Sequence, residues 1–137
     1  MSALTSERNT VLIAAGGLEF TRELEVASGS KIFAGAMAAV DSSGKAVPAV
    51  SSGAITVVGR AENTASGGQT VKTRSGIFLY NNDTTSSAGV ADIGKKAYVA
   101  DDNTVTLTGG TSAVVAGIIR DVTSDGVVLE VGNAQLN

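Results

Sequence analysis

Along most of the chain, short apolar runs alternate with clusters of Gly, Ser, Asn and Asp. The runs are rich in Val, Ile and Thr, which fit a pleated sheet, and they recur roughly every 8–12 residues. After residue 28, apolar positions do not recur at a helical period, so we expect no long amphipathic helix there. The pattern is typical of an antiparallel all-β domain. We predict roughly nine to eleven short strands, mainly within residues 31–40, 47–50, 55–60, 70–74, 77–80, 96–100, 104–108, 114–122 and 127–131.

Turn residues separate these runs. Asp101, Asp102 and Asn103 stand between two alternating runs, which predicts a β-hairpin over residues 96–108. Residues 63–68 and 81–89 are polar and are expected to be loops. The glycine pairs at 67–68 and 109–110 precede neither Lys-Ser/Thr nor a helix, so they are interpreted as turn glycines and not as phosphate loops.

The first residues differ from the rest of the chain. Residues 1–10 lack apolar periodicity, and Val11, Leu12 and Ile13 could form a short strand. Residues 18–26 alternate, with apolar side chains and Arg22 on one parity and mostly Glu on the other. This alternation favours a strand over the helix that Glu, Leu and Arg could also form. We predict an extended or partly ordered N-terminal arm over residues 1–27 and a β domain over residues 28–137. The fold class is a compact antiparallel β-sandwich or barrel of short strands, and strand order is left open between the two.

The composition excludes several classes of catalytic and metal-binding site. The 137 residues include 17 Gly, one Pro and no Cys, His or Trp, and only 4% are aromatic. Such a chain should have a thin core of small side chains, and oligomerisation would add buried surface. Without Cys or His there is no disulfide, thiolate nucleophile, Ser-His-Asp triad or usual transition-metal site. We therefore expect neither enzymatic activity nor a cofactor.

Charge and hydropathy exclude other partners. The net charge of −3 argues against nucleic-acid binding, which needs concentrated positive charge. No apolar run reaches about 18 residues, so no membrane-spanning segment is expected, and the opening residues lack the pattern of a secretory leader.

Three features have both a functional and a structural interpretation. Asp92, Asp101 and Asp102 could offer oxygen ligands to a cation, but their spacing does not match a calcium loop and a hairpin turn accounts for the last two. We expect no metal, and cation binding by this region is left open. Lys95 and Lys96 are interpreted as a solvated beginning of a strand, with contact to an acidic partner as the alternative. Tyr80, beside two Asn residues, could recognise a sugar, but we expect it to end a core strand.

Several segments resemble one family. They are ALTSERNT (3–10), KIFAGA (31–36), VGRAE (58–62), RSGIF (74–78), ADIGKKAYVADD (91–102) and AGIIRDV (116–122). In this order they are similar to capsid cement, or head decoration, proteins of tailed bacteriophages. The likeness runs from about residue 3 to residue 131, and the ADIGK…DD segment is its most specific part. Family members often have a basic, Pro-containing stretch where this chain has VLIAA (11–15).

The resemblance implies a virion structural protein. Such proteins are β domains on the outer surface of the expanded head, where they clamp adjacent major capsid subunits against internal DNA pressure. It implies a homotrimer, with a dimer as the alternative, made in the host cytoplasm and located on the capsid. An arm can bind a capsid by adding a strand to an exposed edge. We therefore expect the arm to contact the capsid through Thr5, Glu7, Arg8, Asn9, Arg22, Glu23 and Glu25, the charged residues forming ion pairs.

Two other functions compete with this one. The first is a phage fibre or surface-adhesion module that recognises host glycans through polar loops. The second, a small β-barrel enzyme or ligand carrier, would need a cavity lined by aromatic side chains, which this composition disfavours.

Overall fold

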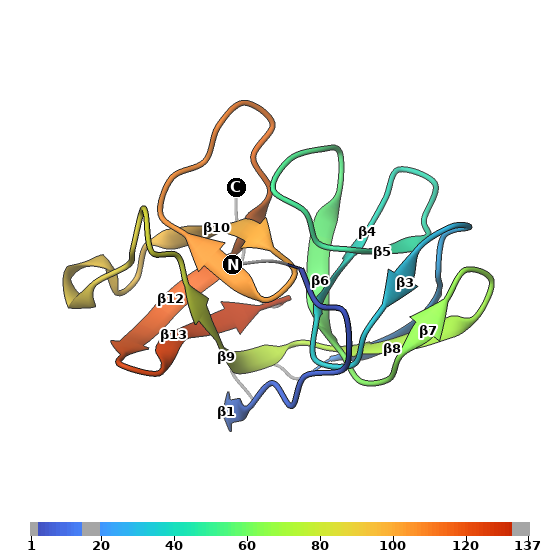
Figure 1. Cartoon of the computed structure of the whole chain (residues 1–137), viewed down its shortest axis with the longest axis horizontal. Coiled ribbons are helices and arrows are strands. Elements are labelled where there is room, and N and C mark those ends of the chain that lie inside the picture. The colour runs from blue at the N-terminus through green and yellow to red at the C-terminus, as the bar shows by residue number, and fades with distance from the viewer. Residues whose placement is uncertain (1–2, 15–19, 133–137) are drawn as a thin grey trace.

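The computed structural model describes residues 3–14 and 20–132. These residues form β-strands, one short 3₁₀ helix and loops. The strands are β1 (Leu12–Ala14), β2 (Thr21–Glu25), β3 (Lys31–Ile32), β4 (Met37–Val40), β5 (Ala46–Pro48), β6 (Thr56–Ala61), β7 (Ala65–Ser66), β8 (Thr70–Arg74), β9 (Gly76–Asn82), β10 (Lys96–Asp101), β11 (Thr104–Thr106), β12 (Val115–Thr123) and β13 (Gly126–Val131), with the helix η1 at Val90–Asp92. The predicted all-β fold is confirmed, and Figure 1 shows two β units lying side by side.

The C-terminal unit is a closed barrel of five strands. Its order is β9-β11-β10-β12-β13, and pairing of β13 with β9 closes the ring. The β9–β11 pair is parallel and the other pairs are antiparallel. The barrel holds the larger core cluster, which contains both buried aromatic side chains, Phe78 and Tyr80. Of the two architectures left open by the sequence, the C-terminal unit is therefore a barrel.

The N-terminal unit is an antiparallel sheet in the order β2-β8-β6-β4-β5. A parallel bridge between Val26 and Ala46 brings the end of β2 against β5. The core of this unit consists mainly of Ala and Val, as the composition predicts, and includes Val26, Ile32, Ala36, Ala38, Ala46, Ala61, Ala65 and Val71. The buried side chains of Met37, Ala39 and Val57 instead belong to the barrel's cluster, so the two units pack against each other.

Several local predictions are confirmed. Residues 21–25 form a strand in which Thr21, Glu23 and Glu25 are exposed. The hairpin of β10 and β11 turns where expected, and the Asp101 carboxylate accepts a hydrogen bond from the Asn103 N–H at 3.0 Å. Tyr80 is fully buried, as expected for a core strand.

Two local predictions need correction. The expected run 31–40 is divided into β3 and β4 by a turn at Gly35, whose φ of +96° suits glycine. Residues 63–68 are not all loop, because Ala65 and Ser66 form β7 and pair with β3. Two residues are too few to give a recognisable apolar alternation.

Candidate interaction surface

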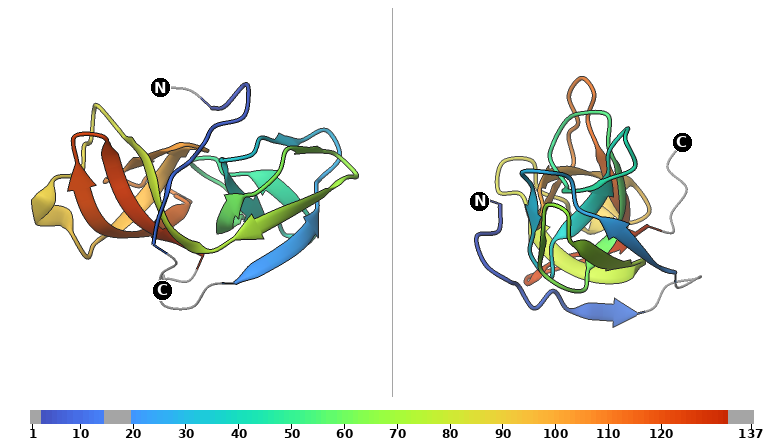
Figure 2. Two further views of the ribbon diagram at one scale, coloured as in Figure 1. Left: turned by 90° about the horizontal axis from the view of Figure 1, so that it is seen from below. Right: turned by 90° about the vertical axis from the view of Figure 1, so that its right-hand side faces the viewer.

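Residues 3–14 lie across the body between the two units (Figure 2). Its hydrogen bonds reach both of them. The Arg8 N–H donates to the Ala34 carbonyl at 2.9 Å in the N-terminal unit, and the Leu4 N–H donates to Asp102 Oδ1 at 3.0 Å in the barrel. At its far end, β1 pairs with β9. This segment therefore connects the two units. From here on, the arm means residues 3–14, the first part of the arm predicted over residues 1–27.

Gly35 sets how closely the arm approaches. A Cβ on Gly35 would lie 1.9 Å from the Arg8 carbonyl oxygen and 2.8 Å from Thr10 Oγ1. The Thr10 hydroxyl donates to the Gly35 carbonyl at 2.5 Å. A residue with a side chain would be strained at this φ angle, and its Cβ would collide with the Arg8 carbonyl. Only glycine therefore fits here without displacing the arm.

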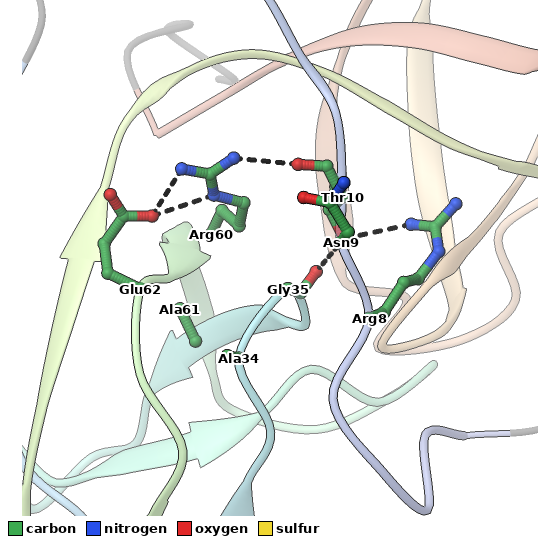
Figure 3. A pocket seen from close by; sticks show the side chains of 8 residues that line it. All are labelled: Arg8, Asn9, Thr10, Ala34, Gly35, Arg60, Ala61 and Glu62. Atoms are coloured by element: carbon green, nitrogen blue, oxygen red, sulfur yellow. Dashed lines mark hydrogen bonds and ion pairs between the residues drawn. The ribbon is translucent and has the colours of Figure 1, made fainter.

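Two arginines lie on either side of Thr10 (Figure 3). Arg60 Nη1 donates to the Thr10 carbonyl at 2.8 Å, and its Nε donates to Glu62 Oε2 at 2.8 Å. Arg8 donates to Thr10 Oγ1 at 3.1 Å, to the Leu79 carbonyl at 3.4 Å and to Asn81 Oδ1 at 3.3 Å. Both arginines are among the residues that line an open pocket of about 220 Å³, called the arginine pocket below.

Each guanidinium also lies against a buried aromatic ring of β9. Arg60 is 4.5 Å from the centroid of Phe78, and Arg8 is 5.7 Å from that of Tyr80. Both distances are within the range of a cation–π contact. Burial raises the pKa of the Tyr80 phenol, against the effect of the nearby Arg60 and Arg8 charges, so the phenol stays neutral near pH 7. These contacts link the arm, β6 and the barrel.

Exposed side chains lie along β1 and β2 on the outside of the molecule. Register shows that both strands run along the same edge of the continuous β8–β9 segment, with Leu12 opposite Phe78 and Thr21 opposite Arg74. Large apolar side chains there are about half exposed: Val11 (46%), Ile13 (49%) and Phe20 (50%). We call the exposed residues of this edge the outer strip: Asn9, Val11, Ile13, Phe20, Thr21, Glu23 and Glu25.

The capsid-contact residues predicted on the arm have different environments. Thr5 and Asn9 are exposed. Glu7 accepts a hydrogen bond from the Thr64 hydroxyl at 2.6 Å, and Arg8 is half-buried under the contacts described above.

The predicted residues of β2 lie together on the outer strip or beside it. The Arg22 guanidinium is 4.7 Å from the Phe20 ring centroid. Glu23 is exposed opposite Lys72, and Glu25 forms an ion pair with Lys45 at 3.0 Å.

Sequence reasoning missed the apolar part of the outer strip and the partners beneath the arm. One signal was available: Arg22 occupies the apolar parity of residues 18–26, which indicates a side that is not fully buried. Leu18 and Glu19 of that pattern lie outside the described residues. Gly35, Arg60 and Glu62 belong to the KIFAGA and VGRAE segments quoted above, but no pattern placed them against the arm, because they meet it only through folding.

The acidic residues considered for cation binding are engaged separately. The Asp92 carboxylate accepts the Gly89 N–H at 2.8 Å and pairs with Lys95 at 3.2 Å, while Asp101 caps the hairpin turn and Asp102 binds the arm. Within residues 3–14 and 20–132, no group of three or more Asp, Glu, His or Cys side chains could hold a metal ion.

A second, polar cleft of about 390 Å³ lies on the barrel, lined by Asn81, Asn82, Thr84, Thr123, Ser124, Asp125 and Gly126. The Asn82 amide donates to the Ala88 carbonyl and accepts its N–H, both at 2.9 Å. The cleft offers hydroxyl groups and a carboxylate but no aromatic platform.

Asp102 gives the arm a pH-dependent contact. Burial raises the pKa of its carboxyl above the ordinary value, and Asp101 acts in the same direction, while the hydrogen bond from Leu4 opposes both. The folded state therefore holds this proton more tightly than the unfolded chain. The stability contributed by this group falls as pH rises from the unfolded pKa of about 3.9 through the raised folded pKa.

Replacing Asp102 by asparagine should therefore stabilise the protein near pH 7, with a gain that shrinks toward pH 4. Asparagine keeps an acceptor for the Leu4 N–H but has no charge to desolvate. Urea unfolding at several pH values measures the difference from wild type, and Asp125→Asn in an exposed turn controls for the change in net charge. The expectation would be contradicted if Asp102→Asn were less stable than wild type at pH 7 and the difference in free energy of unfolding did not shrink toward pH 4.

Comparisons of the chain with protein-family models, with curated proteins and with solved structures found no match. Within the part of the chain that the structure describes, no helix has the length and apolarity needed to cross a membrane.

Proposed function

We propose that this protein is a capsid cement protein of a tailed bacteriophage, which binds the outer surface of the expanded head and joins adjacent major capsid subunits. The observation that carries the proposal is the outer strip, where half-exposed Val11, Ile13 and Phe20 lie along the same strand edge as the charged side chains of β2. The sequence resemblance to head decoration proteins supports the same role. The proposed role is structural, with no catalysis.

The outer strip suits a protein partner for two reasons. First, it combines apolar area, which gains from burial, with charged groups that set orientation. Second, it lies on strands at the edge of the β8–β9 segment, and edge strands offer main-chain groups to an added strand. A homotrimer, or alternatively a dimer, would present several strips at once and raise avidity through effective concentration.

The test is co-sedimentation with expanded heads that lack decoration, followed by electron cryomicroscopy of the pellet. Wild-type protein should pellet and give density on the outer surface. The double variant Val11→Asp and Ile13→Asp should bind at least about 100-fold more weakly, because the contact would lose apolar burial and gain two desolvated carboxylates.

The control is Val90→Asp, which places one such carboxylate on an exposed valine of η1 (69% exposed), away from the outer strip. It should bind like wild type. Folded wild-type protein that leaves such heads bare would overturn the proposal. Equal loss in the control and in the double variant would move the contact away from the outer strip.

One observation favours the alternative, a fibre or adhesion module that recognises glycans. The barrel cleft is lined by hydroxyl and amide side chains of the kind that hydrogen-bond sugars. It lacks an aromatic platform, however, and the Asn82 amide is already bonded within the chain. Binding to host-cell glycans that Ser124→Ala abolishes, with no binding to heads, would favour this alternative.

A further inference from the structure

Arg8 is a half-buried cation that has no carboxylate partner among residues 3–14 and 20–132. Within these residues its guanidinium donates three hydrogen bonds, to a hydroxyl, a main-chain carbonyl and an amide, all of them neutral. Burial lowers its pKa, which reflects the cost of keeping this charge away from water. An uncompensated, partly desolvated guanidinium gains when an anion approaches it.

The neighbouring acidic groups are directed elsewhere. Glu62 accepts hydrogen bonds from Nε and Nη2 of Arg60 and so balances that cation. Glu7, next to Arg8 in the chain, is hydrogen-bonded to Thr64. The lining of the arginine pocket includes two arginines and one glutamate, so it carries a net positive charge.

Arg8 also retains donors. A guanidinium carries five N–H groups in a planar fork, and three hydrogen bonds leave some of them for a ligand. The pocket is open to solvent and, at about 220 Å³, has room for a carboxyl group, since one water molecule needs only about 10–15 Å³ of this kind of space. Exposed Asn9 stands at its rim.

We propose that the arginine pocket binds the carboxylate of an acidic side chain on the protein partner, with Arg8 as its main ligand. Identifying that partner as a capsid subunit rests on the proposed function, whereas the affinity of the pocket for a carboxylate does not. Arg8 then has two roles: it holds the arm to the barrel and it offers the remaining charge of its guanidinium to the partner.

Acetate is a direct probe of the pocket, because it carries the same group as an Asp or Glu side chain. Sodium acetate is titrated into the ¹⁵N-labelled full chain at constant ionic strength, with sodium chloride as the reference salt, and the signals are followed by NMR. We expect saturable shifts of the Arg8 Nε–H and of the Gly35 amide. Arg8→Gln, which keeps donors for the neutral acceptors but removes the charge, should reduce these shifts at least tenfold.

The control is Arg120→Gln, which removes a more exposed arginine that is already paired with Glu130. Its acetate response should equal that of wild type. Shifts that rise linearly without saturation, or that persist in Arg8→Gln, would overturn the inference. So would a response to inorganic phosphate that acetate does not reproduce.

Binding to heads separates this inference from the proposed function. If acetate saturates the pocket but no protein binds heads, the capsid role fails and the carboxylate site stands. If heads are bound equally by wild type and folded Arg8→Gln, the pocket is not the contact and this inference fails, while the capsid role stands.

Discussion

Replacing Gly35 by alanine should displace the arm and lower the free energy of unfolding by about 3 kcal/mol. The new Cβ would lie 1.9 Å from the Arg8 carbonyl oxygen, which belongs to the backbone and cannot rotate away. The φ of +96° adds a cost on the order of 1 kcal/mol for a residue with a side chain. Moving the arm would break the hydrogen bonds from Arg8 to Ala34 and from Thr10 to Gly35, each worth about 1 kcal/mol.

Gly44→Ala provides the matched control for this change. Gly44 has a φ of +80°, and a Cβ there would meet nothing within 4 Å. Gly44→Ala should therefore lower the free energy of unfolding only through its positive φ angle, by on the order of 1 kcal/mol. Urea unfolding gives the two losses, and amide hydrogen exchange at Arg8 reports whether the arm has lost its hydrogen bond to Ala34. Equal losses with a protected Arg8 amide would show that the body yields to the new methyl group instead of the arm.

The elements that could be predicted from the sequence are those whose residue pattern lies within one short stretch of the chain. The β10–β11 hairpin was predictable because Asp101 and its neighbours separate two alternating runs by a short turn. Strand β2 was predictable because alternation outweighs helix propensity over residues 18–26. Closure of the barrel was not, because the pairing of β9 with β13 and the parallel pairing with β11 join segments far apart in the chain.

The candidate site shows the same limit. Arg8 could be selected from a charged opening segment that resembles a known family, but its surroundings could not. Its contacts with Leu79 and Asn81 lie 71 and 73 positions away in the chain. Apolar Val11 and Ile13 carry no sequence mark of exposure, because a short apolar run is equally compatible with a buried strand.

Replacing Phe78 by alanine should be the most destabilising single truncation of an aromatic side chain, at about 3–5 kcal/mol. Phe78 is fully buried on β9, which pairs with both β1 and β13. Its ring packs edge-on against Tyr80, with centroids 6.5 Å apart, and lies under the guanidinium of Arg60. The loss is a large fraction of the 5–15 kcal/mol that stabilises a typical domain.

Phe20→Ala separates burial from the cation contact, because Phe20 also lies against an arginine but is half exposed. Its ring centroid is 4.7 Å from Arg22, close to the 4.5 Å between Phe78 and Arg60. If burial dominates, Phe20→Ala should cost less than about 1 kcal/mol by urea unfolding. Similar losses in the two variants would instead assign the stability to the arginine contacts. On heads the order should reverse, because Phe20 belongs to the outer strip: Phe20→Ala should weaken binding, and the folded fraction of Phe78→Ala should bind like wild type.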